Sequence, residues 1–429
     1  MTTIINPDKS VWPQLLQRPV LDTTALEASV GDILADVKAG GDAAVKKYAA
    51  QFDGATLTDL QVSSAELEAA KALVSDDLKT AIATARQNIT AFHAAQQERM
   101  QPVETMPGVN CWRKSVAIQK VGLYIPGGTA PLFSTLLMLA IPAQLAGCQQ
   151  IVVCTPCQAD GQVNPVILYV AHLLGITTVF KMGGVQAIAA MAYGTETVPQ
   201  VYKIFGPGNQ YVTCAKQLVN KAGVAIDMPA GPSEVAVYAD ASCNPAFVAA
   251  DLLSQAEHGA DSQVLLVAST AAIVEAVQVE LALQLATLPR QAFAAQALAA
   301  SRLVVMDDMT TAFDLLNEYA PEHLIIASDD AVALAERVVN AGSVFLGHFT
   351  PESVGDYASG TNHTLPTNGY AKAYSGVSLD SFVRKVTFQQ LSKAGLATIG
   401  HAVATMAVAE GLQAHANAVR VRLGVKVDG

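Results

Sequence analysis

The sequence has no long apolar run, no basic cluster and no N-terminus of the kind that directs secretion. Its most apolar stretch, Leu136–Ile141, falls far short of the roughly 18 residues of a membrane-spanning helix. The net charge is −11, whereas binding to a nucleic-acid backbone requires basic residues. The first residues lack the basic segment, apolar segment and cleavage site of a signal peptide. We therefore expect a cytoplasmic protein with neither a membrane nor a nucleic acid as partner.

Cysteine is also scarce, and its spacing does not suggest a disulfide framework. The six cysteines are Cys111, Cys148, Cys154, Cys157, Cys214 and Cys243. Cys154 and Cys157 form one C-x-x-C after the apolar run IVV, but a zinc site of this type needs a second pair. We interpret the pair as core or strand-end packing, with a redox or metal role as the alternative.

The sequence is rich in apolar residues arranged in short and long segments. Of its 429 residues, 51% are hydrophobic and 15% charged, which favours two or more lobes with strands covered by helices. After an Ala-rich helical opening, β-branched runs alternate with helical ones from Val116 onward, and a second such series begins at Glu234. This alternation predicts parallel α/β sheets.

Glycine and proline mark the ends of most predicted strands in the first series. They occur at Pro126–Gly128, Gly183–Gly184, Gly206–Gly208 and Pro229–Pro232. Ligands of open parallel sheets bind at the carboxyl ends of the strands, where such backbone allows close approach. Residues 348–367 form a long aperiodic segment of the kind that is often functional, and a helix is expected around 402–422.

A glutamine and a histidine lie on one face of a predicted helix end, because Gln255 and His258 are three residues apart and Gly259 follows. Taken alone, the pair could simply satisfy backbone carbonyls. Other polar groups stand at comparable places: Glu322, His323, Asp356, His363, Glu410 and His415. Imidazole and carboxylate suit an open zinc site, but an amide is a less usual ligand, so spacing by itself does not establish a metal site.

The stretch IDMPAGPSEVAVYADASCNPAFVAADLLSQAEHG, residues 226–259, resembles the signature region of the histidinol dehydrogenase family. Further blocks resemble that family in the same order: GLYIPGGTAPLFST, MGGVQAIAAMAYGTETVP, KIFGPGNQYV, APEHLII, SVGDYASGTNHTLPT and EGLQAHANAVRVRL. The resemblance covers nearly the whole chain. One departure is Cys157, where a proline is expected.

The resemblance implies an α/β fold with two Rossmann-like parallel-sheet lobes, similar to aldehyde dehydrogenases, and small helical N- and C-terminal extensions. We assign residues 1–20 to the N-terminal extension, 21–120 with 234–377 to a first lobe that carries most metal and catalytic residues, 121–233 to an NAD-binding lobe, and 378–429 to a C-terminal helical segment.

The implied activity is the oxidation of L-histidinol to L-histidine through an aldehyde, the last step of histidine biosynthesis, with Zn²⁺ and two NAD molecules in turn. The zinc ligands of the family match Gln255, His258, Asp356 and His415. Zinc has no redox chemistry, so it would hold and orient the substrate. The resemblance gives His323 as the base and Glu322 as the residue that activates water.

The remaining implied contacts concern substrate, cofactor and assembly. Substrate-binding positions match Ser233, Gln255, His258, His323, Asp356, His363, Glu410 and His415, and NAD contacts match Tyr124, Gln186 and Asn209. From the residues alone, His363 could equally bond local backbone, Tyr124 could pack, Gln186 could begin a helix and Asn209 could cap one. The segment GPGNQY lacks the third glycine of G-x-G-x-x-G. Family members are homodimers whose C-terminal segment completes the partner's site.

Two other functions fit parts of the sequence. An aldehyde-dehydrogenase-like enzyme would form a thiohemiacetal, which requires an activated cysteine. A non-catalytic zinc- or metabolite-binding protein would bind metal without producing NADH from histidinol.

Overall fold

The computed structural model describes residues 1–18, 23–98, 100–127, 131–229 and 231–425, and the chain divides into two units. Unit 1 comprises Met1–Gln96 and Ile118–Phe382, and unit 2 comprises Gln97–Ala117 and Val383–Gly429. Gly128, Ala230 and the outer parts of the predicted extensions, at 19–20 and 426–429, lie outside the described residues. None of the helices in the described ranges combines the length and hydropathy that a bilayer crossing requires.

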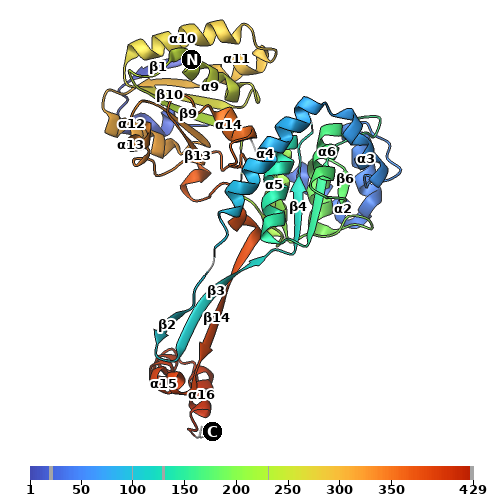
Figure 1. The fold of residues 1–429 in the computed structure, drawn as a ribbon, viewed down its shortest axis with the longest axis vertical. Coiled ribbons are helices and arrows are strands. Elements are labelled where there is room, and N and C mark those ends of the chain that lie inside the picture. Colours follow the sequence, from blue (N-terminus) through green and yellow to red (C-terminus); the bar gives the residue numbers. More distant parts are fainter. Residues whose placement is uncertain (19–22, 99, 128–130, 230, 426–429) are drawn as a thin grey trace. The chain divides into compact units, whose positions relative to one another are not determined.

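The first sheet of unit 1 has six parallel strands in the order β1-β11-β10-β9-β12-β13. Their bounds are Thr2–Ile5 (β1), Glu234–Ala239 (β9), Gln263–Ala268 (β10), Arg302–Val305 (β11), His323–Ala327 (β12) and Ser343–Leu346 (β13). All residues of β9, β10 and β12 are buried, because helices cover both faces of the sheet. The sheet is shown with its yellow and orange helices in Figure 1.

Two hydrophobic clusters lie on the two faces of this sheet. The surrounding helices are η1 (Lys9–Val11), α1 (Trp12–Leu15), α9 (Pro245–Ala256), α10 (Ala271–Leu285), α11 (Gln291–Ala299), α12 (Met309–Tyr319), α13 (Ala331–Ala335) and α14 (Glu352–Tyr357). The sequence places Pro245 at the first turn of α9 and Asn244 at its N-cap, where the amide oxygen accepts from Ala246 N at 3.0 Å. This cap fixes where α9 begins, and so where its other end delivers Gln255.

The second sheet has five parallel strands in the order β6-β5-β4-β7-β8. The strands are β4 (Lys120–Tyr124), β5 (Gln150–Thr155), β6 (Val179–Lys181), β7 (Lys203–Phe205) and β8 (Ala225–Ile226). The helices between them are α5 (Phe133–Ala146), α6 (Pro165–Leu173), α7 (Gly184–Tyr193) and α8 (Gln210–Lys221). The predicted pair of parallel-sheet lobes is thus confirmed.

The N-terminal helices belong with the second sheet, contrary to the expectation that residues 21–120 join 234–377. These helices are α2 (Thr23–Tyr48), α3 (Ser64–Leu73) and α4 (Asp76–Ala94), with the π-helical turn η2 (Ala49–Asp53). Helix α2 packs against α7 and α8, α3 against α6, and α4 against α5. Apolar side chains of this segment, among them Ile82 and Ile89, complete the cluster around α5. Sequence order alone does not reveal which of the two sheets the apolar faces of these helices cover.

The two ends of the chain also contain strands. Residues 1–20, expected as a helical extension, contribute β1 as an edge strand paired with β11, followed by η1 and α1. In unit 2, β14 (Val383–Leu391) pairs antiparallel with β3 (Val109–Ala117), which pairs with β2 (Val103–Met106). Helices α15 (Lys393–Ala409) and α16 (Gln413–Arg422) complete this unit.

Candidate functional site

Gln255 lies in the last turn of α9, and His258 follows just beyond the helix end. The Gln255 side chain is 1% exposed. Its Nε2 lies 3.3 Å from each of three polar atoms: Glu234 O, Glu322 Oε2 and His323 Nδ1. Its Oε1 is buried and has no hydrogen-bond partner among the described residues. The amide nitrogen is therefore held by its neighbours, and the oxygen remains free for a ligand such as a cation.

Glu322 and His323 stand at the start of β12, since His323 is its first residue and Glu322 precedes it. Within a regular strand these neighbours would face opposite sides of the sheet. At the strand entrance both side chains are buried, and Glu322 Oε2 lies 3.7 Å from His323 Nδ1. The main chain of Glu234 holds both, because its N–H donates to Glu322 Oε2 at 2.9 Å and its carbonyl lies 3.1 Å from His323 Nδ1.

Burial and charge strongly shift the pKa values of this pair. Burial raises the pKa of Glu322 to about 8. Burial alone would lower the pKa of His323, but the carboxylates of Glu322, Glu352 and Asp356 outweigh it and raise that pKa to about 10. Groups with strongly shifted pKa values beside one another in a buried site are typical of catalytic centres.

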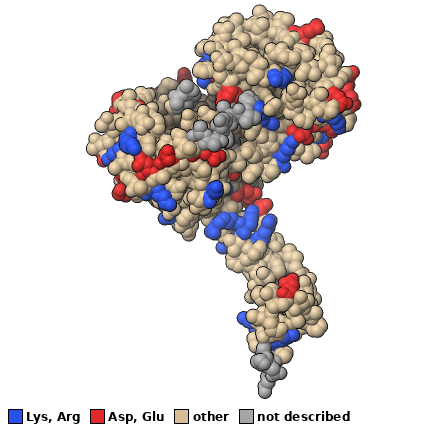
Figure 2. Space-filling model, turned by 180° about the vertical axis from the view of Figure 1, so that it is seen from behind, with Lys and Arg blue, Asp and Glu red and all other residues tan. Residues whose placement is uncertain are grey.

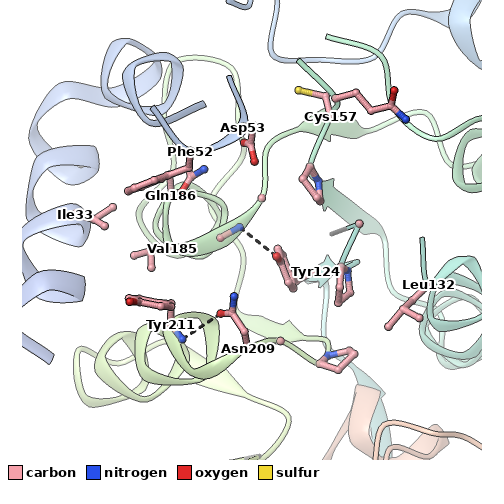
Figure 3. Close-up of a pocket in the computed structure, with 18 of the residues that line it drawn as sticks. Ile33, Phe52, Asp53, Tyr124, Leu132, Cys157, Val185, Gln186, Asn209 and Tyr211 are labelled. Carbon is pink, nitrogen blue, oxygen red and sulfur yellow. Dashed lines mark hydrogen bonds between the residues drawn. The ribbon is translucent and has the colours of Figure 1, made fainter. Parts of the chain in front are cut away.

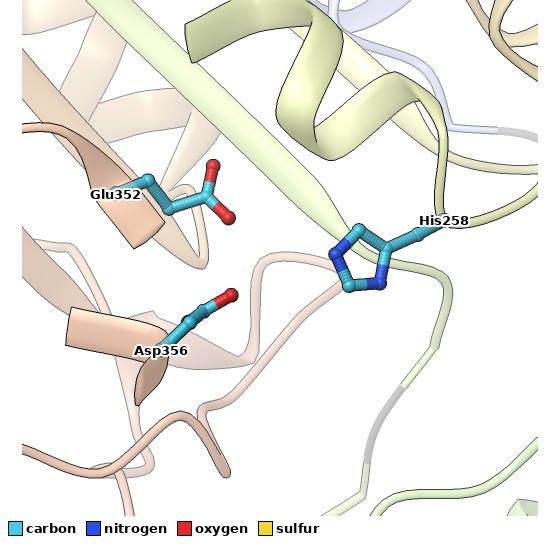
Figure 4. Close-up of side chains that lie close together, drawn as sticks. All are labelled: His258, Glu352 and Asp356. Carbon is cyan, nitrogen blue, oxygen red and sulfur yellow. The ribbon is translucent and has the colours of Figure 1, made fainter. Parts of the chain in front are cut away.

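Three side chains converge beside this pair: His258, Glu352 and Asp356 (Figure 4). One possible ligand atom from each lies within 4.8 Å of the others. Asp356 Oδ1 is buried without a hydrogen-bond partner among the described residues, and it lies 3.5 Å from His323 Nε2. Burial would raise the pKa of Asp356, but the close approach of His323 lowers it. The donor set of imidazole and carboxylates, with the free Gln255 Oε1 nearby, fits a divalent cation.

Glu352 is a residue that sequence reasoning missed. Its side chain is 1% exposed, burial raises its pKa, and its Oε2 accepts from Ser254 Oγ at 3.2 Å. The signal that could have revealed it is spacing, because Glu352 and Asp356 are four residues apart on α14 and share one face of that helix.

Ser233, His258, Glu322 and His363 line one cavity of about 260 Å³. Ser233 directly precedes β9. His363 is bonded at both nitrogens, with Nδ1 3.0 Å from Asp356 O and Nε2 2.8 Å from Thr135 Oγ1. His363 therefore lines the cavity and bonds the backbone of Asp356, and its contact with substrate stays a prediction.

Glu410 and His415 are not grouped with these residues, since both belong to unit 2. Glu410 is the C-cap of α15 and His415 lies in the first turn of α16. Both are exposed in the single chain. The remaining predicted substrate and metal positions all lie in unit 1.

Tyr124, Gln186 and Asn209 line a larger pocket of about 1070 Å³ at the carboxyl ends of the five-stranded sheet (Figure 3). The Tyr124 hydroxyl accepts from Gly184 N at 3.1 Å, and Gln186 is 1% exposed with a buried Oε1 that has no partner among the described residues. Asn209 caps α8, its Oδ1 accepting from Tyr211 N and Val212 N. Asn209 can still bind a ligand, because its Nδ2 is not needed for the cap.

Gly206 begins the loop of residues 206–209, which runs between the two cavities. Gly206 has φ of 130°, and a Cβ there would collide with the Tyr124 carbonyl. Its N–H donates to Asp227 Oδ2 at 2.8 Å and its carbonyl accepts from Lys216 Nζ at 2.8 Å. Lys216 and Asp227 also form a buried ion pair, so one side-chain pair holds the loop that lines both cavities.

A second buried ion pair, Arg18–Glu234, lies beside Glu322 and His323. The Glu234 carboxylate accepts from Arg18 Nε at 2.5 Å and from Arg18 Nη2 at 2.9 Å, and Arg18 also donates to Tyr319 O at 2.7 Å. Glu234 is 2% exposed, so this bidentate pair neutralises a carboxylate that would otherwise be costly to bury. The pair thereby fixes the residue whose main chain holds Glu322 and His323.

The six cysteines are free, and none has the setting of an activated nucleophile. Cys154 is fully buried and burial raises its pKa. Cys157 lines the larger pocket, but burial raises its pKa as well. A thiohemiacetal mechanism needs a thiolate, which these environments disfavour.

Comparison with known proteins shows the family of this chain. The family model described as histidinol dehydrogenase matches residues 16–423. A histidinol dehydrogenase of Bacteroides thetaiotaomicron is 60% identical over 423 residues, covering 99% of each chain, and one of Xylella fastidiosa is 54% identical, covering 97% of each. The crystal structure of histidinol dehydrogenase from Elizabethkingia anophelis superposes with a TM-score of 0.97 at 55% identity, covering 99% of this chain and 98% of that one.

Proposed function

Because the chain belongs to the histidinol dehydrogenase family and is therefore an oxidoreductase, we propose that it oxidises L-histidinol to L-histidine in histidine biosynthesis, with zinc and NAD. The overall change removes two hydrides from the carbinol carbon and adds one oxygen from water, so two NAD molecules are reduced for each histidinol. The observation that carries the proposal is the placement of two unpartnered oxygens, Gln255 Oε1 and Asp356 Oδ1, beside the buried Glu322–His323 pair. Its location in the cytoplasm remains a prediction from the sequence.

Zinc would be held by Gln255, His258 and Asp356, with His415 of a second copy as a further ligand. Desolvation lowers the pKa of His258, which favours the neutral imidazole that a metal requires. When bound, zinc supplies a Lewis-acid centre that holds and orients the amino alcohol, without redox chemistry of its own. Glu352 adds a second carboxylate at the cluster and is oriented by Ser254.

The proton chemistry would belong to His323 and Glu322. The base would be the neutral form of His323: with the Nδ1 proton donated to Glu234 O, its Nε2 carries the lone pair that can remove the hydroxyl proton of the substrate. Nε2 has no hydrogen-bond partner among the described residues. Glu322 lines the smaller cavity and would take a proton from the water that attacks the aldehyde.

NAD would bind in the larger pocket, against Tyr124, Gln186 and Asn209. When bound, it accepts a hydride from the carbinol carbon. His258 lines both this pocket and the smaller cavity, so the two spaces meet at the proposed metal ligand. This arrangement favours placing the nicotinamide end of NAD near His258.

A homodimer would supply Glu410 and His415 from the partner's unit 2. Unit 2 exposes many apolar side chains in the single chain: Val103, Met106, Phe388, Leu391, Val403, Met406, Val408, Leu412 and Val421. The hydrophobic cluster of its helices consists of three alanines, and the part of this unit below the blue group is mostly tan on the face shown in Figure 2. Apolar surface of this extent on a small unit supports association with another chain.

The test of the proposed function is NADH formation from L-histidinol, measured with and without a chelator. We expect two moles of NADH per mole of histidinol consumed, and loss of activity on metal removal that added Zn²⁺ restores. One mole would mean that oxidation stops at the aldehyde. Tight metal binding with no NADH would instead support the non-catalytic alternative.

Shared sites predict complementation between inactive variants. His415→Ala and His323→Ala chains, each inactive alone, should regain part of the activity after subunit exchange, because one site of the mixed dimer receives neither substitution. Exchange is confirmed with differently tagged chains, and a mixture of two His323→Ala preparations is the control. No recovery after confirmed exchange would contradict sites built from two chains.

A further inference from the structure

One carboxylate in the larger pocket has no part in the chemistry described so far. Asp53 is the last residue of the turn η2, before Gly54 in the left-handed region, and it lines the pocket together with Tyr124 and Cys157. In Figure 3 it lies next to Phe52 and points into the space above Tyr124. It is the single acidic residue among those that line this pocket.

The environment of Asp53 does not explain why a carboxylate is there. Its Oδ2 is buried and has no hydrogen-bond partner within the described ranges of the chain. Burial raises the pKa of Asp53 to about 6, so the group is mainly ionised at neutral pH. A buried acceptor without a donor destabilises a fold, and such a group in a cavity calls for a ligand that supplies the donor.

The surroundings indicate which part of a dinucleotide would lie there. His258 and Arg290, which follow α9 and precede α11, line the same pocket, and His258 also belongs to the proposed metal cluster. Asp53 comes from the segment that includes α2, which also contributes Ile33 and Phe52 to the pocket wall. Phe52 is 54% exposed, and with Val185 and Tyr211 nearby in Figure 3 it offers an apolar surface for a base.

We propose that Asp53 determines cofactor specificity: it accepts hydrogen bonds from the ribose hydroxyls of the adenosine half of NAD and excludes the 2′-phosphate of NADP. This inference rests on the proposed function, because it takes the larger pocket as the dinucleotide site. A carboxylate that binds the ribose 2′-hydroxyl is a general solution for NAD selection in α/β sheets. The 2′-phosphate would bring two like charges together in a desolvated place, which strongly disfavours its binding.

The experiment compares NAD with NADP in the wild type and in Asp53→Asn, which removes the charge while preserving the shape. We expect the ratio of kcat/KM for NADP to that for NAD to rise by about tenfold or more in the variant, mainly through KM. The melting temperature of the variant without cofactor should be equal to or above that of the wild type, because an unpartnered buried charge is removed. A purely structural role for Asp53 predicts instead that the variant melts at a lower temperature than the wild type.

Asp59→Asn is the matched control, since it removes the same charge six residues away at an exposed position outside this pocket. It should leave the ratio unchanged. Asp53→Ser serves the same purpose as Asp53→Asn if the latter does not fold.

Three results would overturn the inference: an unchanged ratio, an equal loss with both cofactors, or a lowered melting temperature with no gain for NADP. If the wild type forms no NADH from histidinol, the proposed function fails, and titration with NADH and NADPH by fluorescence still tests Asp53 by binding alone. The two failures are thereby distinguished.

Discussion

Replacing His323 with asparagine is expected to reduce kcat for histidinol oxidation by about 10³-fold or more, since a positioned base contributes about 10²–10⁴-fold and this one would serve both hydride transfers. The imidazole is held by Glu234 O at 3.1 Å, and asparagine can keep that contact through its amide while losing the basic nitrogen. KM for histidinol should change much less than kcat. Steady-state NADH formation provides the measurement, with zinc content checked in parallel.

The variant Glu322→Gln separates the proposed role of Glu322, activation of water, from that of His323, removal of the hydroxyl proton. The amide still fits near Glu234 N, but it cannot accept the proton of an attacking water. NADH yield should therefore fall from two moles towards one mole per histidinol, with aldehyde accumulating, whereas His323→Asn should slow the first NADH as well. Identical yields and rates for the two variants would contradict separate roles for this pair.

Replacing Asp356 with asparagine should weaken zinc binding by more than about 100-fold, because a lost ligand exceeds the 10–100-fold cost of a lost supporting contact. The free Oδ1 of Asp356 is the carboxylate oxygen that the structure leaves for a cation beside His258. Activity at limiting zinc should be lost and only partly restored by excess metal. Zinc content after dialysis, measured by atomic emission, gives the direct readout.

Thermal stability offers a second measurement of the same variant. A ligand that binds only the folded state raises the melting temperature, so added zinc should stabilise the wild type and have little effect on Asp356→Asn. His172→Asn is the control, because His172 lies on α6 near Glu68, outside the proposed site. Equal zinc stabilisation of the wild type and Asp356→Asn would remove Asp356 from the ligand set.

Much of the fold could be predicted because its signals are local. The β-branched runs at β9 and β10 are buried on both faces, and such strands are near-continuously apolar in sequence. Helix α9 and the position of Gln255 at its end followed from apolar spacing and Gly259. The roles of individual site residues came from the family resemblance, since spacing left several alternatives open.

The features that were missed depend on pairings across long stretches of chain. Strand β14 is partly polar, and its partner β3 lies more than 260 residues earlier, so no local pattern joins them. Arg18 and Glu234 are 216 residues apart, and the local sequence around either residue does not indicate the other as its partner. Asp53 lies on a helical segment whose packing against α7 decides that it reaches the larger pocket.

The main chain of Glu234 bonds both Glu322 and His323, at shorter distances than the Gln255 side chain does. Except for proline, which removes the N–H, any residue at position 234 supplies the same peptide groups, so these two contacts tolerate most point mutations there. Evolution could vary the surrounding side chains widely before it disturbed that alignment, and an engineer who wished to redirect it would have to move the strand itself.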